Sequence, residues 1–206
     1  NYQGADKLGR EFYEMCQKSN PDFLMVGEGC YDLQSQYYGT YTRADYWHEP
    51  VLRYIDPTVP IACAVIDHND LNHVNMCLAD RYAMSYEVRN FKGHLGEFPR
   101  VMAYGRKVDN LRRRYADFLW NGEFLDVLGA TVKGDNIRYT VFRNLKNGKK
   151  AVVVYNVDTK KANTASVSID GSSAPLVMAS PEKPAPAKFT GSVTLGPQSA
   201  VVIMEK

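Results

Sequence analysis

The chain has 206 residues, of which 45% are hydrophobic, and this is enough for one sizeable core or two smaller ones. Its formal net charge is +2 with 23% charged residues, so the charge gives no indication of binding to nucleic acid or to an anionic membrane. No apolar run approaches the roughly 20 residues that a membrane span needs.

The first predicted element is a helix over residues 5–18, and Asn20-Pro21 ends it. Its apolar residues recur at helical spacing: Leu8, Phe12, Met15 and Cys16. The following run Phe23–Val26 is apolar without a break, which predicts a strand buried on both faces, as strands of parallel sheets are.

Two more apolar runs, at 61–66 and 83–88, predict a second and a third strand of this kind, with a short helix at 69–81 between them. A helix is also expected over 105–122, where Arg112–Arg114 would form a solvated flank. This alternation of helices and strands indicates a parallel sheet covered by helices.

The composition changes near Gly129. Twelve of the 14 tyrosines, both tryptophans and all 4 histidines precede it, whereas small residues alternate with apolar ones after it. We therefore predict two domains, residues 1–128 and 129–206. The second domain should be an antiparallel β-sandwich, with a hairpin whose type I′ turn is Asn147-Gly148.

The 4 cysteines form no CxxC pair, and no Cys/His cluster has the spacing of a zinc site, so we expect free thiols and no metal. The chain also lacks GxGxxG, a phosphate loop and GxSxG. These absences argue against nucleotide use and against an esterase, and we expect no cofactor.

Carboxylates stand at or near the ends of all three predicted parallel strands: Glu28 between two glycines, Asp67 in "DHND", and Glu87. Because the carboxyl ends of parallel strands form one face, these side chains are expected to be neighbours. Paired carboxylates are what cleavage of a glycosidic bond requires. We therefore predict Glu28, Asp67 and Glu87 as catalytic residues.

A long segment of about 33 residues separates the first two predicted strands, and segments of this length tend to be functional. It is rich in aromatic residues, whose faces stack on sugar rings, and in polar groups that bond sugar hydroxyls. The predicted substrate-binding residues are Tyr31, Asp32, Tyr38, Trp47 and His68.

Structural roles remain open for the same residues. Glu28 is equally suited to a salt bridge or to a position beside a helix N-cap. Asp67 and His68 can cap the helix that follows them, since Asp is favoured at that position. Glu87 fits a solvent-facing strand position.

At "DFLMVGEG", "ACAVIDHND" and "LRRRYADFLWNGEF" before a β domain, the chain resembles the C-terminal part of bacterial glycoside hydrolases. The family meant is that of (β/α)8-barrel enzymes with a C-terminal β-sandwich, such as the α-amylase and α-galactosidase groups. The resemblance implies that Glu28 is the general acid/base or nucleophile. Asp67-His68 reverses the His-Asp order of the amylase group, which weakens the transfer of a role to Asp67.

The resemblance also implies that five barrel strands are missing, because a complete barrel has eight strands and about 250 residues. The fold expected is thus a partial (β/α)-barrel segment followed by a sandwich. Its uncovered strand edges are expected to permit homodimers. A periplasmic or extracellular location is favoured for such an enzyme.

Three functions compete at this point. The first is a carbohydrate-active hydrolase, or its C-terminal part, acting on a carbohydrate substrate. The second is a non-catalytic carbohydrate-binding or scaffold module, in which the carboxylates only bond hydroxyls. The third is a complete small α/β enzyme of another class. A second carboxylate about 5 to 10 Å from Glu28 would favour the first.

Overall fold

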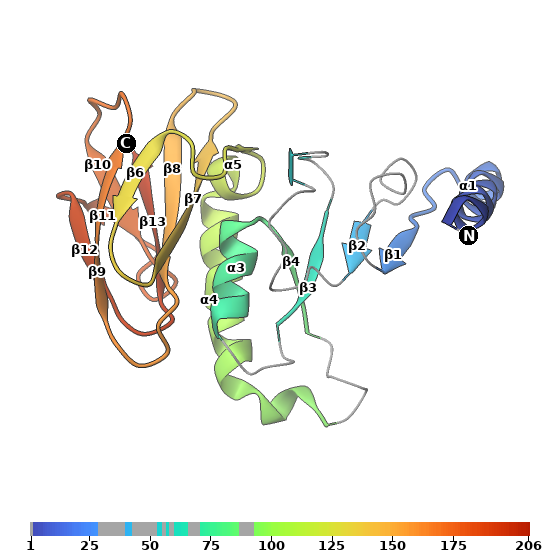
Figure 1. The fold of residues 1–206 in the computed structure, drawn as a ribbon, viewed down its shortest axis with the longest axis horizontal. Helices are drawn as coiled ribbons and strands as arrows, with labels where there is room; N and C mark the ends of the chain where they lie inside the picture. The colour runs from blue at the N-terminus through green and yellow to red at the C-terminus, as the bar shows by residue number, and fades with distance from the viewer. Residues whose placement is uncertain are drawn as a thin grey trace.

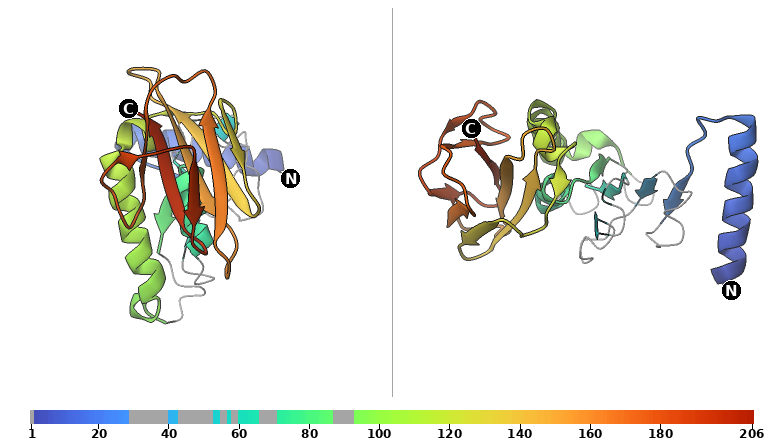
Figure 2. Two further views of the ribbon diagram at one scale, coloured as in Figure 1. Left: turned by 90° about the vertical axis from the view of Figure 1, so that its left-hand side faces the viewer. Right: turned by 90° about the horizontal axis from the view of Figure 1, so that it is seen from above.

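The computed structural model describes residues 2–28, 40–42, 53–54, 57, 60–65, 71–86 and 93–206. Within these ranges, the C-terminal residues form two stacked antiparallel sheets, and two helices lie against the outer face of the larger sheet (Figure 1). Two short pairs of parallel strands lie beyond these helices. The longest described helix in the N-terminal part, α1, stands apart from the other elements, as two further views show (Figure 2).

The N-terminal helix α1, Tyr2–Ser19, confirms the prediction of a helix here. Its apolar side chains are nevertheless exposed: Leu8 at 69%, Phe12 at 47% and Met15 at 59%. The strand predicted at Phe23–Val26 is wrong in position, because β1 is Val26–Glu28. Phe23 instead packs against α1, with its ring centroid 6.2 Å from that of Phe12.

Strand β1 pairs in parallel with β2, Thr40–Thr42, a strand that the sequence patterns did not indicate. The expectation that β1 is buried on both faces does not hold at its first residue, since Val26 is 50% exposed. Four apolar residues in a row therefore did not mark a fully buried strand. The two strands have only three residues each.

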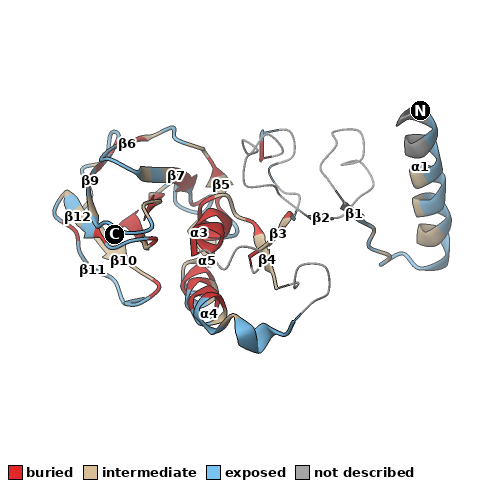
Figure 3. Ribbon diagram, turned by 60° about the horizontal axis from the view of Figure 1, so that its bottom comes forward, coloured by how far each residue is buried: buried red, intermediate tan, exposed pale blue. Residues whose placement is uncertain are grey.

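The second parallel pair joins β3, Ala62–Ala64, to β4, Ala83–Ser85, and confirms the strands predicted at 61–66 and 83–88 as shorter elements. Between them α3, Leu71–Ala79, confirms the predicted short helix and is buried at every residue. Figure 3 shows this helix as the most continuously buried element outside the sandwich.

After the short η3 turn, Leu95–Glu97, the predicted helix over 105–122 begins earlier, as α4, Pro99–Arg114. It stops at Tyr115 and continues as α5, Ala116–Leu119. The expectation of a solvated flank is wrong for Arg112, which is 3% exposed. Arg112 lies on the same side of α4 as the buried residues Val108 and Leu111.

The remaining strands form the two antiparallel sheets, whose orders are β11-β10-β13-β8-β7-β5 and β12-β9-β6. The strands are β5 Glu123–Phe124, β6 Ala130–Lys133, β7 Ile137–Arg143, β8 Lys150–Asn156, β9 Asn163–Ile169, β10 Leu176–Ala179, β11 Ala187–Lys188, β12 Ser192–Leu195 and β13 Ala200–Glu205. The antiparallel β structure predicted for this part is confirmed. The domain limit at 128 remains a prediction.

The β7–β8 hairpin forms, but its turn is not the predicted type I′ turn. That turn needs a positive φ at both central residues, whereas only Gly148, at φ 72°, has one in the loop Leu145–Gly148. The Gly148 N–H donates to Asn144 O over 2.9 Å, so the hairpin has a four-residue loop. Glycine is needed here because it adopts a positive φ without steric cost.

The central strands β8 and β13 are buried on both faces. Val152, Val154 and Ile203 pack between the two sheets, whereas Val153 and Val202 pack against the helical layer. Parallel sheets are the usual place for strands without hydrophobic alternation, but here an antiparallel sheet has the same property. No helix among the described residues is long and apolar enough to cross a membrane.

Candidate functional site

Glu28 is the last residue of β1, where its register partner on β2 is Thr42. The placement of its side chain lies outside what the structure describes. The other predicted catalytic and substrate-binding residues also lie outside the described residues: Tyr31, Asp32, Tyr38, Trp47, Asp67, His68 and Glu87. Their grouping into one site therefore remains a prediction.

The described strands show how these residues are connected to the scaffold. In the β3–β4 pair Ala64 is opposite Ser85, and the two strands are parallel. The segments 66–70 and 87–92 follow these two strands, so both begin at the same edge of the sheet. This edge is where sites are built in parallel α/β folds, and this favours the predicted grouping of Asp67 with Glu87.

The helix that follows the "DHND" segment is fixed firmly from the first described residue onward. On α3, the Asn75 amide donates to Gln198 O over 3.0 Å, and the Tyr104 hydroxyl donates to Asn75 Oδ1 over 2.7 Å. Both Asn75 and Tyr104 are buried. Buried polar groups that bond one another position an element more exactly than apolar contacts do, so α3 provides a rigid support for the segment before it.

Two more hydrogen bonds join α3 to the sandwich. Asn72 Nδ2 donates to Val157 O over 2.9 Å, and the Thr140 hydroxyl donates to Ala79 O over 2.6 Å. One bond lies near the start of α3 and the other at its end. The sandwich therefore holds the helix that adjoins the predicted site.

Burial keeps two acidic groups beside α3 neutral. It raises the pKa of the Tyr104 phenol, and it raises the pKa of the Cys77 thiol well above its usual value, with a further contribution from the neighbouring Cys63. Cys63 and Cys77 are both free and buried. These groups are suited to packing rather than to proton transfer near neutral pH.

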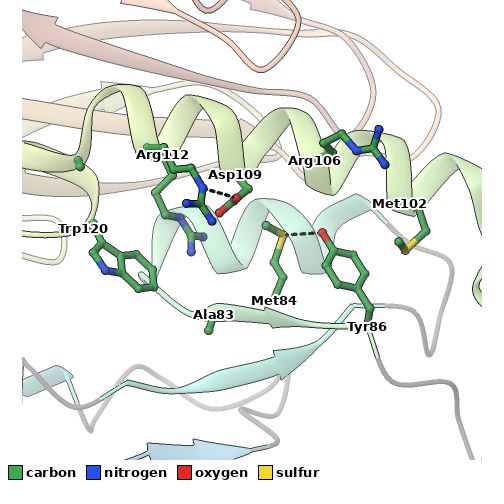
Figure 4. A pocket seen from close by; sticks show the side chains of 10 residues that line it. Ala83, Met84, Tyr86, Met102, Arg106, Asp109, Arg112 and Trp120 are labelled. Carbon is green, nitrogen blue, oxygen red and sulfur yellow. Dashed lines mark hydrogen bonds and ion pairs between the residues drawn. The ribbon is translucent and has the colours of Figure 1, made fainter.

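A cavity of about 610 Å³ lies between β4 and the helices α4 and α5 (Figure 4). Met84, Tyr86 and Met102 lie toward one end of it and Trp120 at the other, with Arg106, Asp109 and Arg112 along α4. The sequence patterns did not reveal this cavity. The available signal was an Arg/Asp face on a helix that also carries Met102 and is followed by Trp120.

The sandwich presents no exposed aromatic ring, as its residues 129–206 are all described. Phe142, Tyr155 and Phe189 are buried, and Tyr139 is half-buried. Aromatic platforms for sugars are therefore not a property of this part of the chain. Among the described residues, no group of three or more His, Cys, Asp or Glu side chains is arranged to hold a metal ion.

The sequence matches no protein-family model and no curated protein significantly. Comparison of the fold with solved structures does find similar proteins. A noncanonic maltogenic α-amylase, AmyB from Thermotoga neapolitana, matches with a TM-score of 0.58 and 9% identity over 95% of this chain. Amy13B of Eubacterium rectale matches with a TM-score of 0.55 and 12% identity over 100% of this chain.

These matches concern only part of each protein, since the chain spans 58% of the length of AmyB and 57% of that of Amy13B. At such low identity they show a common fold. The chain has the mixed helix-and-sheet architecture of the matched part of both proteins, including the antiparallel sheets.

Proposed function

We propose that the chain is a glycoside hydrolase, or the C-terminal part of one, which cleaves glycosidic bonds by carboxylate chemistry. The observation that carries this proposal is the fold shared with AmyB, a maltogenic α-amylase, over 95% of the chain. Fold alone does not define activity, because one fold hosts many functions. The site residues and their test therefore decide the proposal.

In the proposed mechanism Glu28 is the acid/base or the nucleophile, and Asp67 or Glu87 supplies the second carboxylate. One carboxyl protonates the leaving oxygen, while the other attacks the anomeric carbon or activates water. The position of Glu28 at the end of β1 and the parallel pairing of β3 with β4 support this assignment. Tyr31, Asp32, Tyr38, Trp47 and His68 would bind the sugar.

We further propose that this chain supplies only part of the barrel of the active enzyme. A closed (β/α)8-barrel has eight parallel strands, whereas the described residues contain four short ones, β1 to β4. The chain also spans 58% of AmyB. The remaining strands would fix the spacing of the carboxylates, which catalysis requires to within a fraction of an ångström.

The alternative of a carbohydrate-binding module receives less support. A sugar platform on the sandwich would need exposed aromatic rings, and residues 129–206 present none. The aromatic residues available for sugar binding belong to the segment at 31–47, beside the predicted catalytic Glu28. Binding and catalysis would therefore use the same site.

The test is an assay of the full-length gene product on aryl glycosides and oligosaccharides, with Glu28→Gln beside the wild type. The substitution keeps the size of the side chain but removes its ionisable carboxyl. Activity should fall by several orders of magnitude, because acid/base and nucleophile roles each contribute about 100-fold or more. Glu14→Gln, on the exposed surface of α1, is the matched control and should keep full activity.

The 206-residue chain alone should have little activity in the same assay. Undiminished turnover by the Glu28→Gln variant would remove Glu28 from the mechanism. Strong activity of the isolated chain would instead show that no further barrel strands are needed.

A further inference from the structure

The cavity between β4 and α4 lies along an unpaired side of β4. On this strand, Ala83 N–H donates to Ile61 O over 2.7 Å, and Val65 N–H donates to Ser85 O over 3.0 Å. Both bonds face β3. Successive residues of a strand direct their backbone groups to opposite sides, so the N–H and C=O of Met84 between them point away from β3, toward the side of the cavity.

The cavity has the length and the lining that a short strand requires. Along α4 it extends from Met102 to Arg113, about 16 Å at the helical rise of 1.5 Å per residue. About five residues of an extended chain cover this distance. Met84, Met102 and Trp120 provide apolar surface for side chains on one face of such a strand, and Trp120 is 43% exposed.

The charge of the cavity favours an acidic partner. Three arginines line it, Arg106, Arg112 and Arg113, against the single carboxylate of Asp109. Arg113 already pairs with Asp109 over 2.7 Å, whereas Arg106 makes no ion pair with another described residue. Arg112 is buried, and its hydrogen bonds go to neutral carbonyls. A carboxylate near Arg106 would balance this excess of positive charge.

We propose that this cavity is a docking site for an extended peptide segment, which adds a strand parallel to β4 and carries apolar side chains at alternate positions and one acidic residue. The backbone of the segment bonds Met84, its apolar side chains contact Met102 and Trp120, and its carboxylate faces Arg106. Strand addition at a sheet edge derives its affinity from such main-chain hydrogen bonds. The proposal is independent of the hydrolase activity proposed above.

The Tyr86 hydroxyl offers the segment a further polar contact. It lies 3.6 Å from Met84 Sδ, a weak acceptor, and the charge of Arg106 acts on it. A donor held only by a thioether can turn toward a stronger acceptor with little loss. A carboxylate placed near Arg106 would be such an acceptor.

The test uses a fluorescein-labelled seven-residue peptide, capped at both ends, in which valine and threonine alternate and one glutamate is included. Fluorescence anisotropy measured with the 206-residue chain should rise and saturate. A second peptide, N-methylated at alternate residues on the edge that would face β4, cannot make the strand hydrogen bonds and should not bind. A third peptide with lysine in place of glutamate should bind more weakly.

Two variants of the protein locate the binding. Ala116→Phe places a ring in the cavity and should weaken binding at least tenfold, whereas Ala103→Phe, on the exposed side of α4, should not. Arg106→Gln should weaken binding about two- to fivefold, as an exposed ion pair would. Arg138→Gln, on β7 of the sandwich, is its control and should bind normally.

Three results would overturn the proposal. The first is no saturable rise up to about 1 mM protein, the weakest affinity that such contacts would give. The second is equal binding of the N-methylated peptide, which would indicate an apolar pocket without strand addition. The third is a dimer in sedimentation velocity that Ala116→Phe dissociates, because the occupant would then be a second copy of the chain.

Discussion

Arg112 joins three elements from a buried position. Its guanidinium donates to Cys77 O over 2.6 Å, at the end of α3, and to Tyr82 O over 2.8 Å, before β4. It also lies over the ring of Trp120, 5.0 Å from the centroid. Burial lowers its pKa, although nearby groups, among them Cys77 and Asp109, partly offset this effect. The side chain therefore acts as a clamp between α4, α3 and β4.

Replacing Arg112 should be costly. The Arg112→Met variant fills similar space but leaves two buried carbonyls without their donors, and we expect a loss of about 3 kcal/mol in unfolding free energy. Urea unfolding followed by circular dichroism measures it. Arg113→Met is the control, and its unfolding free energy should hardly change, because that side chain is exposed. Similar effects of the two substitutions would contradict the clamp.

The buried phenol and thiol make stability depend on alkaline pH. In the unfolded chain a tyrosine loses its proton near pH 10, whereas Tyr104, with its raised pKa, keeps it in the folded state. The folded state then binds more protons, so its stability falls as pH rises above about 10, by about 1.4 kcal/mol per pH unit for each such group. Cys77 acts in the same direction from a lower pH.

Tyr104→Phe should make this alkaline decline less steep. It should also cost about 1 kcal/mol at neutral pH, because the hydrogen bond to Asn75 is lost. Unfolding free energies measured between pH 7 and about 11.5, in the presence of a reducing agent, give both quantities. An unchanged slope would show that Tyr104 ionises equally in the folded and unfolded states.

At the scale of elements, the contact of α4 with β4 depends on Gly105. A Cβ atom at this position would overlap the Tyr86 hydroxyl, so the absence of a side chain lets the Tyr86 ring lie directly against the helix. Tyr86 is half-buried there, and burial raises its pKa. Glycine within a helix costs about 1 kcal/mol relative to alanine, which this contact offsets.

Gly105→Ala should therefore destabilise the protein by about 1 to 2 kcal/mol despite its better helix propensity, because the tyrosine must move. Adding Tyr86→Phe removes the overlapping hydroxyl and should restore part of the loss. Gly4→Ala is the control: nothing lies within 4 Å of the added Cβ, so stability should not fall. Thermal unfolding of the four variants completes the comparison, and additive losses in the double variant would exclude this contact.

Most elements were predictable from the sequence, but some of their limits and faces were not. The residues of α3 and of the sandwich strands follow patterns strong enough to locate them. Phe23–Met25 misled because an apolar run contacts whatever is nearest, and for Phe23 this is α1. Arg112 was assigned to solvent because its neighbours are arginines, although its spacing from Val108 places it on the buried side.

The candidate site was less accessible to prediction. Its carboxylates belong to segments between strands, where periodicity gives no information on the direction of side chains. The cavity beside β4 combines residues from three elements, among them Met84, Arg106 and Trp120. Such a surface depends on how elements pack, and no local pattern in the sequence encodes it.

At the scale of the whole molecule, the larger sheet has one face in each of two cores. Val153 faces the helical layer and Val154 faces the second sheet, and both are fully buried. The helices and the sandwich should therefore unfold together. Val153→Ala and Val154→Ala should each cost about 2 kcal/mol, because each leaves a small cavity in a packed core.

The measurement compares Trp120 fluorescence in a Trp47→Phe background, which reports the helical layer, with far-UV circular dichroism, which is dominated by the larger structure. The two unfolding curves should coincide in each variant, as a two-state transition requires. Separate curves, with Val154→Ala shifting only one of them, would show that the two layers are independent.

The two-sided burial of the larger sheet also limits how the C-terminal part can be reused. A protein cut at Gly129 would keep all the strands from β6 onward but would expose the apolar side chains that α3 and α4 now cover. These side chains are Phe142, Ala151, Val153, Tyr155, Val202 and Met204. Released strands with such a face tend to aggregate. The sandwich is therefore no portable module, and grafting it onto another protein would require a replacement for its helices.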